Sequence, residues 1–138
     1  MKPELRFFIY LSKIQAILSR KFDARLGGLS FSEFIILYHL SQAPEEKLRG
    51  TDLAEKIGLT ASGVTRLLGP MAKIGLVRRE VDQRDARVSY VVLAPGGKRK
   101  FDEALKDGEL LSAEIISSSK IGPVKDFCQG LKNIAKVI

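Results

Sequence analysis

The sequence has only one cysteine, one histidine and no tryptophan among its 138 residues. A single cysteine cannot form a disulfide bond within the chain, which is typical of proteins in a reducing compartment. One histidine and one cysteine also exclude most zinc sites and any catalytic triad that needs a histidine beside a separate base. We therefore expect neither a metal nor another cofactor.

Long apolar runs are absent as well. No run approaches the roughly 20 residues that a membrane-spanning helix needs. Glu4 and Arg6 stand where a signal peptide would have its apolar core. The sequence therefore predicts a cytoplasmic protein without a membrane contact.

The chain has enough apolar residues, 45%, for the core of a single domain, and 28% of its residues are charged. Its net charge of +7 is concentrated in the middle of the sequence. Residues 49–100 carry eleven basic and five acidic side chains, whereas residues 1–48 carry seven and five, and residues 101–138 carry five and six. Positive charge concentrated in one segment indicates an anionic partner.

Hydrophobic periodicity predicts a mainly helical chain with one small β-hairpin. The expected order is α-α-(β)-α-α-β-β-α-α, with the bracketed strand optional. We expect helices over about 3–25, 30–42, 51–57 and 61–74, a helix that begins at 95 and includes 101–115, a last helix after 123, and strands over 76–81 and 88–93. Ser30 and Glu33 have the spacing of a capping box at the start of the second helix. Gly69 and Pro70 predict an interruption late in the fourth helix.

The segment from Gly50 to Leu68 has the pattern of a helix-turn-helix. Ala54 is small enough for two helices to cross, Gly58 tolerates the positive φ of the turn, and Val64 provides an apolar anchor. A helical hairpin with a glycine turn and no DNA contact is the alternative. In a helix-turn-helix, the start of the second helix enters the major groove. The residues expected to contact DNA there are Thr60, which also caps the helix, Ala61, Ser62, Thr65 and Arg66.

The predicted hairpin follows directly and is rich in arginine. Arg84 and Arg87 lie in its connection, beside Asp82 and Asp85, and both arginines are candidates for DNA contact. An arginine at the tip of a ribbon can enter an A·T-rich minor groove, and the aspartates would hold the arginines by charge-assisted hydrogen bonds. Alone, such a hairpin would be interpreted as a solvated turn with internal salt bridges. Further on, Lys98 begins a basic helix that can contact a phosphate.

These residues resemble the signature of the multiple-antibiotic-resistance regulator (MarR) family of bacterial and archaeal transcription factors. The resemblance rests on Thr60–Leu68, on Gly75–Val77 and on the pattern Asp82-x-Arg84-Asp85-x-Arg87. It implies one winged helix-turn-helix domain over 1–138 in a two-fold dimer, with DNA binding by residues 30–100 and dimerisation by residues 1–28 and 101–138. It also implies that Arg84 enters the minor groove, while Asp82, Asp85 and Arg87 brace the wing.

Many relatives in this family take up small aromatic or lipophilic effectors between the two parts of the molecule. The aromatic residues Phe7, Tyr10, Phe34 and Tyr38 are candidates for such a pocket, although aromatics at helical spacing are commonly core residues. We expect His39 to be a partly buried structural histidine. We expect Cys128 to be a packed, inert thiol on an apolar stripe.

The sequence thus predicts a homodimeric, sequence-specific DNA-binding repressor that acts on a pseudo-palindromic operator. The resemblance alone implies release by a small-molecule effector, and a constitutive regulator without a ligand is the alternative. The alternative is a winged-helix adaptor that binds an acidic protein instead of DNA. No enzyme is expected, because the pattern Ser117-x-x-Lys120 lacks the further motifs and the larger fold that serine acylases need.

Overall fold

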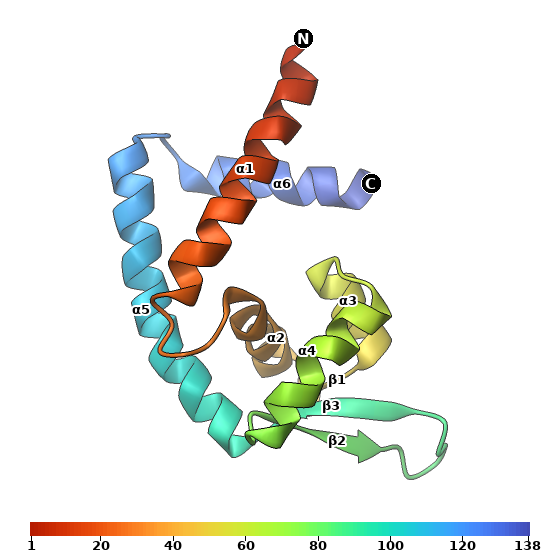
Figure 1. Ribbon diagram of the computed structural model, residues 1–138. Helices are drawn as coiled ribbons and strands as arrows, with labels where there is room; N and C mark the ends of the chain where they lie inside the picture. Colours follow the sequence, from red (N-terminus) through yellow and green to blue (C-terminus); the bar gives the residue numbers. More distant parts are fainter.

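The chain folds into six α-helices and one three-stranded antiparallel sheet in the computed structural model, which describes residues 1–138 (Figure 1). This confirms the predicted mainly helical fold with a hairpin and the predicted order of elements. The helices are α1 (Pro3–Asp23), α2 (Phe31–Gln42), α3 (Gly50–Ile57), α4 (Ala61–Lys73), α5 (Pro95–Ser119) and α6 (Val124–Val137). The strands are β1 (Lys47–Arg49), β2 (Val77–Val81) and β3 (Ser89–Leu93), and the 3-10 turn η1 (Pro44–Glu46) precedes β1.

Helix α2 lies at the centre of the fold because it is apolar on nearly every side. Ile36, Leu37 and Leu40 are completely buried. The predicted capping box is present: the backbone N–H of Glu33 donates to the Ser30 hydroxyl at 3.0 Å, and the Ser30 N–H donates to the Glu33 carboxylate at 2.8 Å. These two bonds satisfy donors that would otherwise be unpaired at the helix start.

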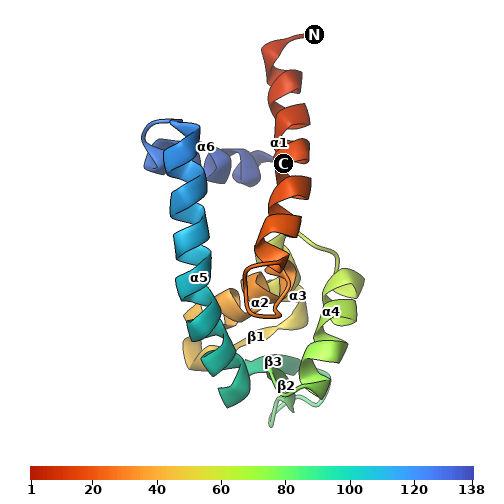
Figure 2. The same cartoon turned by 60° about the vertical axis from the view of Figure 1, so that its left-hand side comes forward.

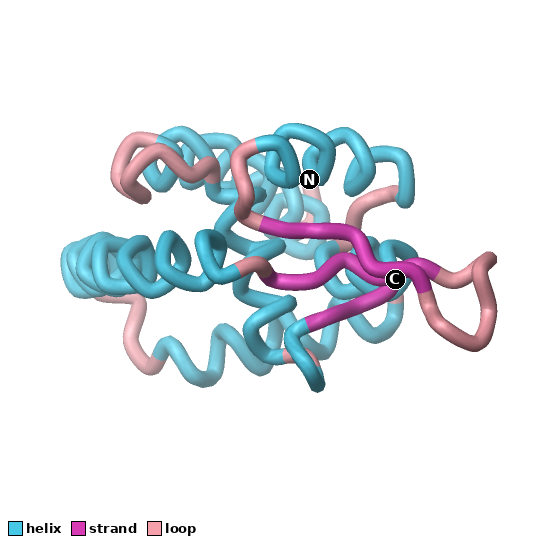
Figure 3. The backbone as a smooth tube through the Cα atoms, turned by 90° about the horizontal axis from the view of Figure 1, so that it is seen from below, coloured by secondary structure: helices cyan, strands magenta, loops and turns pink.

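The sheet has the strand order β1-β3-β2. Its face toward the helices carries the buried residues Val77, Val91 and Leu93. The opposite face is polar, since Lys47 and Glu80 lie there with Tyr90 between them. Seen from below, the loop between β2 and β3 extends beyond the helices as a wing (Figure 3).

The predicted interruption of α4 does not occur. The helix continues through Gly69 and Pro70 to Lys73. Pro70 stands near the last turn, where its missing N–H removes one helical hydrogen bond and the remaining turn is completed by the bond from the Ile74 N–H to the Pro70 carbonyl at 3.3 Å. The part of α4 that precedes Pro70 is therefore a continuous helix.

Helices α1 and α6 contribute little to the core of the chain. Of the 22 buried residues, α1 supplies only Phe22 and α6 supplies none. Both helices lie at the end of the molecule opposite the wing (Figures 1 and 2). Cys128 is exposed on α6, so it is not packed within the chain as expected, because α6 rests on no core surface. None of the helices combines the length and apolar character needed to cross a membrane.

Candidate nucleic-acid interface

Helices α3 and α4 meet in the helix-turn-helix arrangement that their sequence predicts. Ala54 and Val64 are only 5% and 1% exposed because the two helices approach closely at these residues. Gly58 between them adopts φ 81°, and its N–H donates to the Ala54 carbonyl at 2.9 Å. Only glycine takes this left-handed conformation without a steric cost, so the turn depends on Gly58.

The start of α4 is rigid and open to solvent. The Thr60 hydroxyl accepts the Gly63 N–H at 3.1 Å, and the Thr65 hydroxyl donates to the Ala61 carbonyl at 3.0 Å. On the opposite side of the helix, Val64, Leu68 and Met71 are buried and fix its rotation. The residues predicted to contact DNA therefore share one exposed surface: Thr60, Ala61, Ser62, Thr65 and Arg66.

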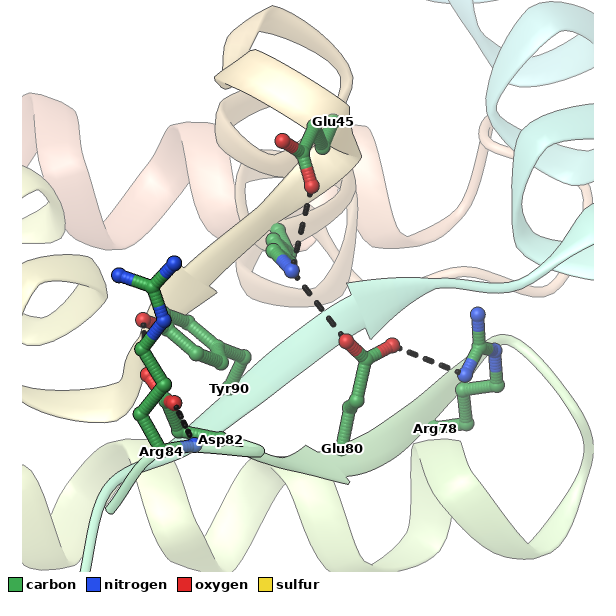
Figure 4. Close-up of polar contacts among 7 residues, drawn as sticks. Glu45, Arg78, Glu80, Asp82, Arg84 and Tyr90 are labelled. Atoms are coloured by element: carbon green, nitrogen blue, oxygen red, sulfur yellow. Dashed lines mark hydrogen bonds and ion pairs between the residues drawn. The ribbon is translucent and has the colours of Figure 1, made fainter.

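Asp82 organises the first half of the wing (Figure 4). Its carboxylate accepts the backbone N–H of Arg84 at 2.8 Å through Oδ1 and the hydroxyl of Tyr90 at 3.1 Å through Oδ2. The hydrogen bond from the Arg84 N–H, and to a smaller extent the one from the Tyr90 hydroxyl, keep the pKa of the Asp82 carboxyl below its ordinary value. Partial desolvation acts in the opposite direction, since it raises this pKa. The sequence led us to expect that Asp82 would bind an arginine side chain. It binds the backbone N–H of Arg84 instead.

Asp85 binds the side chain of Arg87 in the second half of the wing. Two parallel bonds join the guanidinium to the carboxylate, from Nε at 3.1 Å and from Nη2 at 3.2 Å, and the Arg87 N–H adds a third at 3.0 Å. The bonds from Arg87 hold the pKa of the Asp85 carboxyl below its ordinary value. Arg84 differs, because its exposed guanidinium makes no ion pair within the chain and is free to bind an external anion.

A network of ion pairs at the base of the wing includes residues that the sequence did not single out. The Lys47 ammonium lies 3.2 Å from Glu45 and 3.2 Å from Glu80, and Arg78 lies 3.3 Å from Glu80 (Figure 4). The hydrogen bonds that Lys47 donates to Glu45 and Glu80 raise the pKa of Lys47. Lys47 and Glu80 are 33 residues apart in sequence, so only the strand register could have predicted the contact.

Lys98 lies exposed in the first turn of α5, 3.6 Å from Glu46. The residue that precedes α5 is Ala94, whose side chain cannot cap the helix. A phosphate could contact the exposed ammonium of Lys98. The ion pair with Glu46 is solvent-exposed and weak, so it competes little with such a contact.

A cavity of about 430 Å³ lies between α2 and α5. Phe34 and Tyr38, which we proposed as pocket residues, line it. Phe7 and Tyr10 do not, because they lie on α1 away from the cavity, where they are 44% and 59% exposed. The other residues at its wall are Phe22, Phe31, Ile35, Leu105, Gly108, Glu109 and Ser112.

His39 is half-buried beside the ring of Tyr38, with 5.0 Å between the ring centroids. Burial, with a smaller effect from Lys56, lowers the pKa of His39. The histidine is therefore held in its neutral form over a wider pH range. No group of three or more candidate ligands in the chain could hold a metal ion.

The helix-turn-helix, the three-stranded sheet and the projecting wing define a winged helix-turn-helix protein. A model of the MarR family matches residues 27–88. Across 101 residues the chain is 31% identical to the HTH-type transcriptional repressor YetL of Bacillus subtilis (strain 168), a match that spans 73% of this chain and 59% of YetL. The chain therefore covers about three fifths of the length of this relative.

Solved structures agree along the whole chain. The transcriptional regulator BldR from Sulfolobus solfataricus matches with a TM-score of 0.88 and 29% identity, covering 100% of both chains. The transcriptional regulator MOSR of M. tuberculosis, solved in complex with DNA, matches with a TM-score of 0.79 and 25% identity, covering 93% of this chain and 92% of MOSR. The chain has the winged helix-turn-helix fold of these transcriptional regulators, and its residues 27–88 match the MarR family.

Proposed function

We propose that the chain forms a homodimeric repressor that binds a pseudo-palindromic DNA operator. This proposal rests on one observation: two arginines that form no ion pair within the chain each project from a segment that internal hydrogen bonds hold in place. Arg66 projects from the capped start of α4, and Arg84 projects from a loop tied down by Asp82. Arginine can bind a guanine edge in the major groove, or enter the narrow minor groove of A·T-rich DNA. The similarity to MOSR, which was solved in complex with DNA, also supports DNA binding.

The dimer would form through α1, α6 and the adjoining end of α5. Most of the large apolar side chains that stay exposed belong to α1 and α6, among them Phe8, Ile14, Phe127 and Leu131. A single chain that exposes this much apolar surface at one end needs a partner surface. A second copy supplies it by symmetry, with residues 1–28 and 101–138 as the dimerisation region and residues 30–100 as the DNA-binding part.

A small aromatic or lipophilic effector would bind in the cavity between α2 and α5. The wall is formed mainly by aromatic and aliphatic side chains, with Glu109 and Ser112 as the polar groups at its edge. A bound effector would weaken DNA binding by favouring a dimer in which the spacing of the two α4 helices no longer matches successive major grooves. The protein would carry out this regulation in the cytoplasm.

Fluorescence anisotropy would test DNA binding. The probe is a labelled duplex from the DNA immediately beside the gene for this chain, in about 150 mM salt, with shuffled DNA as competitor. We expect tight binding that shuffled DNA does not displace. Equal displacement by shuffled DNA would contradict sequence-specific regulation at this site. A folded dimer with no DNA affinity would instead favour the protein–protein adaptor.

A further inference from the structure

The wing turn is joined to the sheet by the backbone bond from the Asp82 N–H to the Val88 carbonyl at 2.9 Å and by one side-chain bond from a hydroxyl group. Tyr90 on β3 donates to Asp82 Oδ2 at 3.1 Å, and Asp82 Oδ1 accepts the Arg84 N–H at 2.8 Å. One carboxylate therefore joins the middle strand of the sheet to the backbone of Arg84. Since the Arg84 side chain has no partner within the chain, the direction in which it leaves the wing depends on this backbone connection.

The ring of Tyr90 is itself held in place by β1 and β2. The Lys47 ammonium lies 4.8 Å from the ring centroid, a distance at which a cation is attracted to an aromatic face. Lys47 is fixed by Glu45 and Glu80, each at 3.2 Å. The register explains this convergence, because Tyr90 pairs with Arg49 on β1 and with Glu80 on β2.

A tyrosine that only fills space on a strand needs no partner for its hydroxyl beyond water. Here the hydroxyl bonds to the carboxylate that also holds the wing turn. Without this bond, the Asp82 carboxylate would still accept the Arg84 N–H and the Asp82 N–H would still donate to the Val88 carbonyl at 2.9 Å, but the carboxylate itself would have no bond to the sheet. The turn would then sample several directions, and binding in one of them would cost more conformational entropy.

We propose that Tyr90 is a positioning residue for DNA recognition, whose hydroxyl orients the Asp82 carboxylate and through it the backbone of Arg84. This inference rests on the proposed DNA-binding function. Tyr90 acts without touching DNA, since its hydroxyl is used by Asp82. Lys47 supports the same device by holding the ring.

The variant Tyr90→Phe removes the hydroxyl and keeps the ring, with its contact to Lys47. Solvent exchange of backbone amide hydrogens, measured by NMR, reports on the wing without any DNA. We expect the Arg84 amide to exchange roughly three to ten times faster in the variant. The Arg87 amide provides an internal control, because it donates to Asp85 at 3.0 Å and has no contact with Tyr90. Equal exchange of the Arg84 amide in both proteins would overturn the inference.

A double-mutant cycle with Arg84→Ala tests the effect on DNA. The probe is the fluorescein-labelled duplex beside the gene, about 30 base pairs long, in two versions with A·T-rich or G·C-rich flanks. We expect Tyr90→Phe to weaken binding roughly three- to tenfold on A·T-rich flanks, less on G·C-rich flanks, and not at all when Arg84 is already alanine.

Two results separate this inference from the proposed function. The first result applies when the wild type binds its site specifically. If Tyr90→Phe then binds DNA as tightly as the wild type, or if it lowers DNA affinity by the same factor in the Arg84→Ala background, Tyr90 does not act through Arg84 and the inference is wrong. If the wild type itself fails to distinguish its site from shuffled DNA, the proposed function fails, whereas the amide exchange of Arg84 still decides whether Tyr90 orders the wing.

Discussion

The main chain at Gly97, in the first turn of α5, runs against the carbonyl group of Leu76 at the start of the hairpin. A Cβ atom on residue 97 would overlap the Leu76 oxygen, and it would lie 2.9 Å from the carbonyl carbon and 3.0 Å from Cδ1 of Leu93. The same oxygen accepts the Ala94 N–H at 3.1 Å. Helix α5, which leads to α6, is thus seated directly on the base of the wing hairpin.

Gly97→Ala should destabilise the fold by about 1–3 kcal/mol, because the added methyl group can be accommodated only if α5 moves away from the hairpin. Gly69→Ala is the matched control. It also lies within a helix, but an added Cβ there meets no atom within 4 Å. Alanine should therefore stabilise α4 by about 0.5–1 kcal/mol. Urea unfolding followed by circular dichroism measures both, and equal effects of the two substitutions would contradict the close seat of α5.

Arg84→Ala should weaken operator binding by about 1–3 kcal/mol, mostly where A·T-rich sequence flanks the half-sites, because a narrow minor groove attracts arginine through its strong negative potential. Titrations of labelled duplexes with A·T-rich and G·C-rich flanks measure the difference. An equal loss on both duplexes would argue against recognition of minor-groove shape.

Lys98→Ala should reduce affinity evenly for all sequences, since a phosphate contact carries no sequence information. The slope of log affinity against log salt should fall by about one. Repeating the titration at several salt concentrations measures this slope. An unchanged slope would remove Lys98 from the phosphate contacts.

The sequence predicted those features whose signals lie close together along the chain. The capping box of Ser30 and Glu33, the turn at Gly58 and the cap at Thr60 each depend on contacts within a few residues, so fixed spacing was sufficient. The ion pair of Lys47 and Glu80 depends instead on which residues of β1, β3 and β2 stand opposite one another. A register shift by one residue would reverse the faces of these side chains, and composition does not specify it.

The same limit applies to single residues whose role depends on distant backbone. The close approach of Gly97 to Leu76 could not be predicted, because nothing near Gly97 in the sequence points to Leu76. Phe7 and Tyr10 were pocket candidates because relatives in the family take up effectors between the two parts of the molecule, yet the α1 residue that lines the cavity and packs on Phe31 is Phe22. Periodicity indicates that a helix has an apolar face but not which surface covers it.

Phe127→Asp should convert the proposed dimer into monomers. Phe127 is 50% exposed on α6, and a carboxylate there would be buried without a partner in the interface, so we expect the dimer to weaken roughly tenfold or more. Gln129→Asp is the control, because Gln129 lies on the other side of α6 and bonds to Asn133 at 2.8 Å. Sedimentation velocity at micromolar concentration measures the oligomeric state. A monomeric wild type, or a dimeric Phe127→Asp, would contradict dimerisation through this surface.

The charge on Asp82 should make wing stability depend on pH in a predictable direction. The Arg84 N–H and then the Tyr90 hydroxyl lower the pKa of this carboxyl in the folded protein, so the folded state releases the proton more readily than the unfolded chain. The stabilisation is therefore fully present above the ordinary aspartate pKa of about 3.9 and is lost as the pH falls through the lower folded value.

Carbon-13 NMR titration of the Asp82 carboxyl checks both the sign and the cause. In the wild type the midpoint should lie below that ordinary value, and in Tyr90→Phe it should move upward, because one of the bonds that favour the charged form is lost. Asp85, whose pKa is lowered mainly by Arg87, should keep its midpoint in the same variant. If both midpoints move together, the variant has disturbed the whole wing, and if neither moves, the Tyr90 hydroxyl does not hold Asp82 in solution.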